Sequence, residues 1–310
     1  MMTALALVTL AGCDKSEKEE PWNGEIRLSS GVTVMESRAA VDLQETALAN
    51  TTVSTQNVGI YVEDEGTGTT LYPNMVLMPG DAGALTPASQ MYYPATGNAV
   101  NMYAYYPRNT NWDVKTTAHD FAVAADQSED QGYLASDLLW GGPASNPVAR
   151  TKDEVELGFK HVLTKVKLTI TSNKGTPDLR GAKVYITGTR PATTFRPVDG
   201  TITAAKDADD MTGYADGILV AVGTATDKIE AAAVIVPQTI DGSISPVPFI
   251  RIKLAAGGEL VYKLDTEKVF TSGTVHEYEI AANLTELTVT SKITGWKSIG
   301  EPTQGTAGME

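Results

Sequence analysis

The sequence predicts an all-β protein in which two antiparallel β-sandwich domains stand in tandem along the chain. Residues 165–171 and 250–254 alternate apolar with polar side chains, and a period of two is typical of half-buried antiparallel strands. Turn signals rich in Gly, Pro, Asn and Asp separate many such segments. No 3.6-residue apolar pattern continues beyond about three helical turns, so long helices are not expected.

Length, charge and cysteine content limit the classes of function. With 310 residues, 42% of them hydrophobic, the chain is long enough for two domains of about 150 residues each. The formal net charge of −14 and the lack of any Lys/Arg-rich run exclude nucleic acid as an expected partner. One Cys and three His cannot form an internal disulfide or a cysteine-based metal centre, so we expect no metal and no cofactor.

Residues 1–12 are predicted to be a lipoprotein signal peptide. Met1–Leu10 is almost entirely apolar but too short for a membrane-spanning helix, which needs about 20 apolar residues. The Leu-Ala-Gly-Cys sequence that ends at Cys13 resembles the lipobox of bacterial lipoproteins, in which this Cys is acylated. We therefore expect a lipid such as palmitate on Cys13, followed by an acidic tether over residues 13–24. The alternative, a buried N-terminal strand with a structural Cys, lacks β-alternation.

The N-terminal sandwich domain is predicted over residues 25–174. Its strand-like segments lie between turn signals such as 65–68 and 78–81, and residues 42–49 are the best short helix candidate. Strands are expected at Glu25–Met35, Val58–Val62, Leu71–Met78, Ala99–Tyr106, Phe121–Ala124, Val155–Leu157 and 165–171.

The C-terminal sandwich domain is predicted over residues 178–300. The link to it is expected at 172–180, where Asn173-Lys174-Gly175-Thr176-Pro177 breaks one strand before the next begins. Strands are expected at Lys183–Thr187, Ile218–Val222, Glu230–Val236, 250–254, Glu259–Leu264, Thr274–Ile280 and Glu286–Ile293.

The chain carries no recognisable enzyme motif. It has no Gly-x-Ser-x-Gly, no phosphate-binding Gly-rich loop and no His-Glu-x-x-His, so we predict no catalytic residues. A glycosidase would need two carboxylates about 5–10 Å apart, and the sequence indicates no such pair. The acidic run at 207–210 lacks the Gly and the distal Glu of a calcium loop. His161 and His276 are expected to be structural or surface residues.

Two groups of tyrosines allow two interpretations. Tyr92 and Tyr93, with Tyr103, Tyr105 and Tyr106, could form a platform on which sugars stack. Aromatic residues are also enriched in strands, where they pack in a sandwich core or along its edge. The second interpretation is preferred.

Several stretches, in order along most of the chain, resemble the fimbrillin-type proteins of Bacteroidales. They are Met91-Tyr92-Tyr93-Pro94, Met102–Pro107, Ser136–Trp140, Phe159–Val166, Val234–Gln238, Tyr278–Thr290 and Ile293-Thr294-Gly295-Trp296. The charged residues after Cys13 also resemble the stretch that marks surface-exported lipoproteins of this group. The resemblance implies two transthyretin-like domains, export as a lipoprotein to the cell outer membrane and assembly into type V fimbriae (pili).

The resemblance also implies how such a subunit assembles. In these pilins the N-terminal β-strand fills a groove in its own domain until an Arg-specific protease cuts behind it, and a strand of another subunit then takes its place. A sheet that lacks a strand exposes unpaired backbone groups, which a donor strand satisfies. The matching residues here are the strand Glu25–Met35, its apolar residues Ile26, Leu28, Val32 and Val34, and the cleavage point Arg38-Ala39. The alternative for Arg38 is an ordinary loop arginine.

The C-terminal segment 284–296, with Leu287 and Val289 on one face, is the candidate donor strand or else a permanent strand of the second domain. We therefore predict a structural or adhesive subunit of a fimbria. Its expected partners are other subunits, the outer membrane through the lipid, and a receptor or glycan on a host or bacterial surface. The alternative is a surface lipoprotein that binds glycans and does not polymerise.

Overall fold

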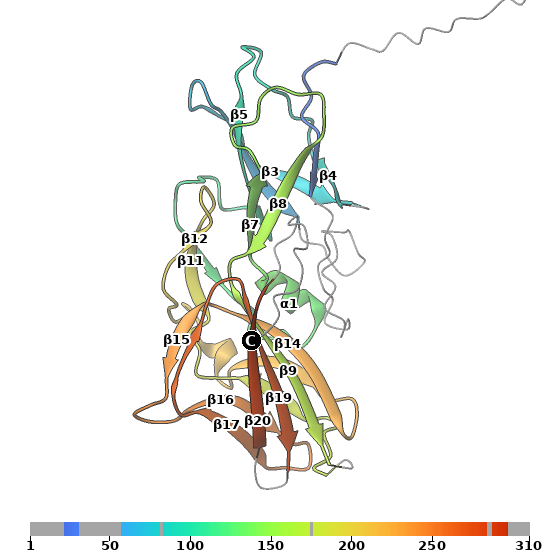
Figure 1. Cartoon of the computed structure of the whole chain (residues 1–310), viewed down its shortest axis with the longest axis vertical. Helices are drawn as coiled ribbons and strands as arrows, with labels where there is room; N and C mark the ends of the chain where they lie inside the picture. The colour runs from blue at the N-terminus through green and yellow to red at the C-terminus, as the bar shows by residue number, and fades with distance from the viewer. Residues whose placement is uncertain (1–21, 31–56, 81–82, 174–175, 284–286, 297–310) are drawn as a thin grey trace, which may run out of the picture.

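The computed structural model describes residues 22–30, 57–80, 83–173, 176–283 and 287–296. Within these ranges the chain is all-β, with one short α-helix, α1 (Asp130–Ser136). Figure 1 shows an elongated molecule, with the N-terminal strands at one end of the long axis and the C-terminal strands at the other.

Seven strands at the N-terminal end form a closed barrel in the order β1-β4-β3-β2-β5-β7-β8, here called the N-terminal barrel. Side chains alternate between its interior and its surface: in β8, Val155, Leu157 and Phe159 are buried while Glu156 and Lys160 are exposed. The strands are β1 (Leu28–Ser30), β2 (Val58–Asp64), β3 (Thr70–Pro79), β4 (Ala84–Pro87), β5 (Val100–Tyr106), β7 (Leu139–Pro143) and β8 (Val155–His161).

The C-terminal end contains two four-stranded sheets, β14-β9-β19-β20 and β13-β10-β16-β17, here called the C-terminal sheet pair. The sheets face each other, because the ring centroid of Tyr278 in β19 lies 5.6 Å from that of Phe249 in β16 and 6.1 Å from that of Tyr262 in β17. The strands are β9 (Thr164–Ser172), β10 (Lys183–Ile186), β13 (Ile218–Val222), β14 (Lys228–Ile235), β16 (Val247–Lys253), β17 (Glu259–Leu264), β19 (Thr274–Ala282) and β20 (Leu287–Gly295).

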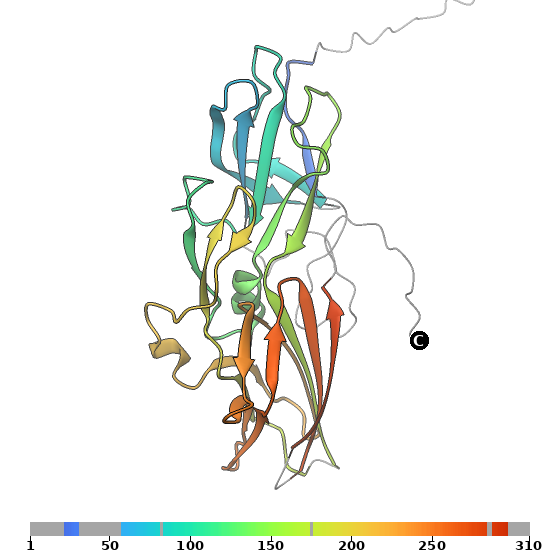
Figure 2. The same ribbon diagram turned by 60° about the vertical axis from the view of Figure 1, so that its left-hand side comes forward.

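A smaller sheet, β12-β11-β6, covers part of the outer face of the barrel. It packs there through aromatic rings: the centroid of the Tyr105 ring in β5 lies 5.9 Å from that of Phe195 in β11. Trp112, in the connection before β6, lies 5.1 Å from Tyr105 and 5.5 Å from Phe195. Figure 2 shows the yellow hairpin of β11 and β12 beside the barrel strands. The remaining elements are β6 (His119–Ala122), β11 (Ala192–Arg196), β12 (Thr201–Ile202), the paired β15 (Gln238–Asp241) and β18 (Glu267–Phe270), and a 3-10 turn, η2 (Thr212–Tyr214).

Most predicted strands are present close to their predicted limits. β13 and β17 have the predicted limits, and β2, β3, β5 and β10 differ from them by one or two residues at an end. The helix candidate at 42–49 lies outside the described residues. Elements that were not predicted are β4, β7, β11, β12, β15, β18 and α1.

The chain crosses from the barrel to the sheet pair earlier than the predicted link at 172–180. β9, which the predicted boundary assigns to the N-terminal domain, pairs with β14 and β19 of the sheet pair. The crossing therefore lies at Val162-Leu163, between β8 and β9. The turn signal at 173–177 connects β9 to β10 inside the sheet pair, because Gly and Pro end a strand wherever it stops and do not by themselves mark a domain boundary.

Candidate functional site

β1 is the strand that closes the N-terminal barrel. It pairs antiparallel with β4, where Leu28 lies opposite Leu85, and parallel with β8, where Leu28 lies opposite Val155. The other pairings around the barrel are antiparallel. Because parallel neighbours cannot be joined by a tight hairpin, β1 reaches its place as a separate segment that fills the gap between β4 and β8.

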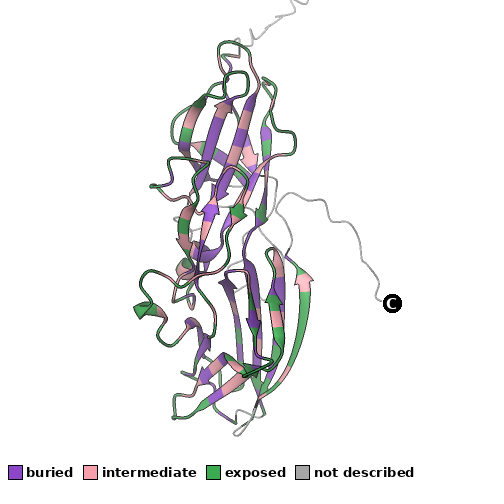
Figure 3. Cartoon of the chain, turned by 90° about the vertical axis from the view of Figure 1, so that its left-hand side faces the viewer, coloured by how far each residue is buried: buried purple, intermediate pink, exposed green. Residues whose placement is uncertain are grey.

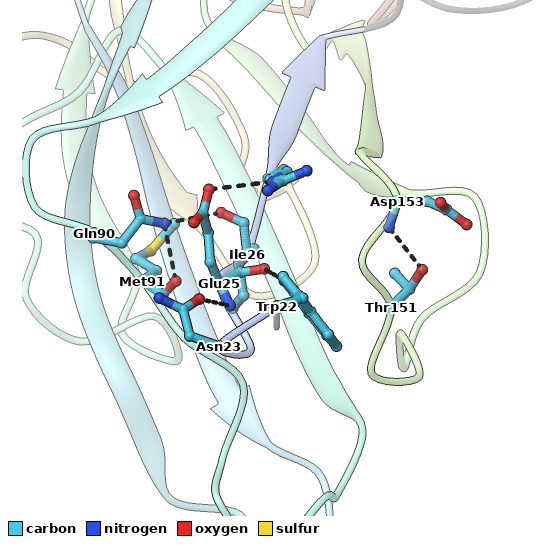
Figure 4. A network of polar contacts seen from close by, with 9 residues as sticks. Trp22, Asn23, Glu25, Ile26, Gln90, Met91, Thr151 and Asp153 are labelled. Atoms are coloured by element: carbon cyan, nitrogen blue, oxygen red, sulfur yellow. Dashed lines mark hydrogen bonds and ion pairs between the residues drawn. The ribbon is translucent and has the colours of Figure 1, made fainter. Parts of the chain in front are cut away.

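Backbone hydrogen bonds hold the segment before β1 on both of its sides. On one side the Ile26 N–H donates to the Met91 carbonyl at 2.8 Å. On the other side the Val155 N–H donates to the Arg27 carbonyl at 2.9 Å. The Gln90 side chain donates to the Met91 carbonyl at 3.2 Å, and Figure 4 shows Gln90 and Met91 beside Ile26. The segment is thus bonded as an inserted strand even outside the limits of β1.

Every second side chain of the segment points into the barrel. Ile26, Leu28 and Ser30 are 1%, 5% and 1% exposed, whereas Arg27 is exposed. The Ser30 hydroxyl donates to the Gly83 carbonyl at 3.0 Å, so the one polar inward side chain is satisfied. Figure 3 shows that buried residues follow the barrel strands while most loops are exposed. Ile26 and Leu28 are therefore part of the barrel core.

Trp22 fixes the entry of the segment into the barrel. Its ring packs edge-on against Tyr93 with centroids 6.1 Å apart, and the Arg150 guanidinium lies over it at 5.0 Å. The indole N–H donates to the Glu25 carbonyl at 3.2 Å. Gly24 has a φ of +90°, and a Cβ there would lie 2.8 Å from Arg150 Nη2. Only glycine therefore fits this bend without strain.

Removal of residues 22–30 would leave two open strand edges and an apolar gap. The edges are those of β4 and β8, which β1 now separates. The gap would be lined by buried side chains of the same core as Ile26 and Leu28, among them Leu85, Met91 and Leu157. Such a gap fits any extended segment that places apolar side chains at alternate positions, because the unpaired backbone groups and the apolar surface are satisfied together.

Two of the predicted site residues fill this position in the barrel, and most of the others lie outside the described residues. Ile26 and Leu28, predicted as apolar residues of the exchanged strand, are both in the barrel core. Five predicted site residues lie outside the described residues: Cys13, Val32, Val34, Arg38 and Ala39.

The predicted donor segment contains β20, the edge strand of the sheet pair. β20 pairs antiparallel with β19 along its whole length, from Leu287 opposite Ala282 to Gly295 opposite Thr274. Leu287 and Val289 are half-buried and pack against the core of the sheet pair. Among the described strands, none pairs with the outer edge of β20. In this structure the segment completes its own sheet.

Trp296, just after β20, lies at the junction between the barrel and the sheet pair. Its ring stacks on His161 with centroids 3.6 Å apart, and Lys165 Nζ lies 5.6 Å from the ring centroid. His161 Nδ1 lies 2.7 Å from a carboxylate oxygen of Asp137, and both side chains are buried. Sequence alone could not identify this cluster, because its members come from separate segments, although Trp296 ends one of the fimbrillin-like stretches.

The tyrosines do not form one exposed platform. Tyr105 and Tyr106 are fully buried, and burial raises the pKa of Tyr105. Tyr93 is also buried, whereas Tyr92 is 40% exposed and Tyr103 is partly exposed. The preferred interpretation, in which strand aromatics pack in the core, is confirmed for the buried tyrosines.

The described part of the chain shows neither a metal-binding cluster nor a membrane-spanning helix. Across the ranges that the structure covers, no group of three or more His, Cys, Asp or Glu side chains could hold a metal ion. The acidic run at 207–210 is exposed at Asp207, Asp209 and Asp210. None of the helices in these ranges is both long enough and apolar enough to cross a membrane. The gap that holds β1 is the site with the clearest geometry.

Comparison with known proteins shows where this fold occurs. A crystal structure of a proposed cell adhesion protein from Bacteroides uniformis has a TM-score of 0.63 and 18% identity, over 89% of this chain and 100% of that chain. Another, from Bacteroides ovatus, has a TM-score of 0.66 and 15% identity, over 88% of this chain and 98% of that chain. These likenesses show the fold alone. A search of curated proteins gave no match.

A family model, unlike these structures, shows to which protein family the chain belongs. The model for fimbrillin-like proteins matches residues 41–296. The matched region contains every described strand except β1 and ends at Trp296. The chain therefore belongs to the fimbrillin-like family.

Proposed function

We propose that this chain is a structural or adhesive subunit of a type V fimbria that assembles by exchange of its N-terminal strand. Its two transthyretin-like domains would be the N-terminal barrel and the C-terminal sheet pair, which meet near residues 162–163. One observation carries the proposal: β1 is a three-residue strand inserted between β4 and β8, with Ile26 and Leu28 in the barrel core.

The size of β1 favours its replacement. Its ladder is short, and short ladders open at lower free-energy cost than the rest of a fold. A longer donor strand would restore the same backbone bonds and fill the positions of Ile26 and Leu28.

Maturation would proceed in two steps at the N-terminal end. Acylation of Cys13 would anchor the exported chain at the surface of the outer membrane, with residues 13–24 as the tether. Cleavage between Arg38 and Ala39 by an Arg-specific protease would then separate β1 from the rest of the chain. The loss of the covalent link allows the strand to leave the barrel.

The strand that replaces β1 would come from another fimbrial subunit. In this chain the corresponding donor is the segment of β20, with Leu287 and Val289 as the apolar residues that would enter the next subunit. Both side chains are half-buried and β20 is an edge strand, so its release breaks one ladder rather than two.

N-terminal sequencing and electron microscopy of shed fimbriae test the proposal. We expect wild-type fimbriae to begin at Ala39, and the Arg38→Ala variant to stay intact from Cys13 and to remain monomeric. Arg27→Ala is the matched control, because Arg27 is an exposed arginine of the same N-terminal segment. Wild-type chains that are always intact from Cys13 and never found in polymers would contradict the proposal.

A second candidate function is that of a surface glycan-binding lipoprotein that does not polymerise. The buried tyrosines give it no support, but Tyr103 borders a hollow on the outer face of the barrel together with Trp140. Electron microscopy of the shed protein separates the two candidates, because only a fimbrial subunit would be found in polymers.

A further inference from the structure

A hollow of about 640 Å³ lies on the outer face of the N-terminal barrel, beside the turn between β11 and β12. It is here called the outer hollow, and its lining includes Tyr103, Trp140, Glu156 and Asp199. No residue of the inserted segment 22–30 lines it, so it is separate from the gap that holds β1. Its volume is within the range of about 300–1,000 Å³ that is usual for small-molecule sites.

The outer hollow exists because two glycines meet on one face of the barrel. In the β7–β8 ladder, Gly142 lies opposite Gly158, and in the next outward-facing row Trp140 lies opposite Lys160. Tyr103 of the neighbouring β5 borders the same space. Because paired residues share a face of the sheet, the two glycines leave this face without side chains, and aromatic side chains stand next to it.

The walls of the outer hollow are fixed before any ligand binds. The Trp140 indole donates to the Pro197 carbonyl at 2.8 Å, and a Cβ on Gly200 would lie 2.5 Å from Trp140 Cγ. Also in the lining, the Asn146 side chain donates to the Met102 carbonyl at 3.2 Å and accepts from the Met102 N–H at 2.9 Å. Rigid walls reduce the ordering cost of binding.

The rim combines rings with charged groups. Glu156 and Lys160 are exposed, and Lys160 Nζ lies 4.8 Å from the centroid of the Trp140 ring. Asp199 is bonded to Arg196 but keeps part of its carboxylate open to solvent. A saccharide unit presents an apolar C–H face to an aromatic ring and hydroxyl groups to such donors and acceptors.

We propose that the outer hollow binds a neutral saccharide unit of a surface glycan. Neutral sugars are favoured because the charges at the hollow compensate one another: Glu156 and Lys160 both line it, and Asp199 is paired with Arg196. An extended peptide is disfavoured, because β7 is already paired with β5 and β8 and the Met102 backbone is bonded to Asn146. This site is independent of strand exchange and goes beyond fimbrial assembly, and it gives the glycan-binding candidate a specific location and a specific class of sugar.

Binding of short neutral oligosaccharides to the full chain tests the proposal. The probes are gluco-, galacto- and manno-oligosaccharides, with sialylated and uronate oligosaccharides as acidic comparisons, measured by saturation-transfer NMR and titration calorimetry. Tyr103→Ala removes one aromatic side of the hollow and Glu156→Gln removes one carboxylate. The matched controls are Tyr92→Ala and Glu154→Gln, which change an exposed Tyr and an exposed Glu of the N-terminal half outside the hollow.

We expect at least one neutral oligosaccharide to bind, and both hollow variants to weaken its binding by about tenfold or more while the controls bind as the wild type does. Equal binding by all variants, no binding of any neutral probe, or binding of acidic probes alone would each overturn the proposal. The proposal would also be overturned if a peptide of residues 284–296 bound to the chain and the variant Tyr103→Ala abolished that binding. Glu156→Gln changes an exposed side chain, so it remains informative if Tyr103→Ala fails to fold.

Discussion

Two strands of this molecule, β1 and β19, are both paired in parallel with one neighbour and antiparallel with the other. β1 has three residues and closes the barrel between β8 and β4. β19 has nine residues and lies between β9 and β20. The same mixed pairing therefore occurs in a strand of three residues and in a strand of nine residues.

The difference between the two strands lies in what each one buries. β19 contributes Val275, His276, Tyr278 and Ile280 to the core of the sheet pair, and its ladders extend over the whole strand. The segment around β1 contributes mainly Ile26 and Leu28. A parallel strand is thus held firmly when the core is built around it. It is held more weakly when it adds only two large apolar side chains to a core that other strands already surround.

The largest expected effect is at Tyr278 in β19. Its side chain is 1% exposed, so Tyr278→Ala should lower the free energy of unfolding by about 3–5 kcal/mol, as measured by urea denaturation. Tyr278→Phe is the matched control. The hydroxyl has no hydrogen-bond partner among the described residues, so its removal should leave stability unchanged or slightly higher. Equal losses for Ala and Phe would show that the hydroxyl, not the ring, stabilises the sheet pair.

The next effect is a loss of stability in acid that originates in β19 and not in β1. Burial, with a smaller contribution from Lys268, lowers the pKa of His276 to about 4. The unfolded chain takes up this proton near pH 6.5 and the folded chain does not, so stability should fall as the pH drops from about 6.5 to 4, by about 2–3 kcal/mol.

The variant His276→Phe isolates this contribution. Its ring can occupy the same buried site beside Phe270, whose ring centroid lies 4.6 Å from that of His276. The difference between the wild-type and variant stability curves should change with pH between 6.5 and 4 and be flat below 4. Parallel curves over that window would show that His276 titrates normally in the folded protein.

A smaller effect is expected at Leu28 in β1. Leu28→Ala should weaken the docking of the segment by about 1–2 kcal/mol, less than a usual core Leu→Ala change, because a short strand can undock without unfolding the rest. Hydrogen exchange should accelerate at Val155, whose N–H bonds to the segment, and remain slow in β19. Faster exchange in both places would mean that β1 and β19 belong to one cooperative unit.

The smallest effect is expected at Ser29, the matched control for Leu28. Its side chain is only partly buried and alternates with the inward-facing positions, so Ser29→Ala should leave stability and the exchange of Val155 unchanged. A loss as large as that of Leu28→Ala would indicate that the backbone of β1, rather than its inward side chains, controls docking.

Much of the fold could be predicted because period-two alternation is a local property. Ile26 and Leu28 fall on one face for this reason. The limits of β13 and β17 follow from an equally local signal, because Gly217 and Gly223 flank β13 and Gly257-Gly258 precedes β17. β7 was missed because its Gly141-Gly142-Pro143 sequence has low strand propensity, and it exists through pairing with β5 and β8. The short strands β4 and β12 likewise form through pairing with the neighbouring strands β3 and β11.

The candidate sites also depend on pairings that local sequence patterns do not predict. No local pattern places Leu28 beside Val155, because a parallel pairing depends on the path of the whole chain. The outer hollow depends on Gly142 lying opposite Gly158, and a shift of one residue in that register would turn one of them to the other face. Sequence can identify the residues that suit a role but not the partners that complete it.

Trp296 gives the C-terminal end of β20 an attachment that would resist mechanical tension. Its stacking on His161, and the hydrogen bond of 2.6 Å from its N–H to the Gly273 carbonyl, hold the point at which the chain leaves β20. A pulling force applied beyond residue 296 therefore meets this clamp before it reaches the β19–β20 ladder. The clamp lies at the junction of the two halves, so the load enters near the middle of the molecule and spares the far end of the sheet pair.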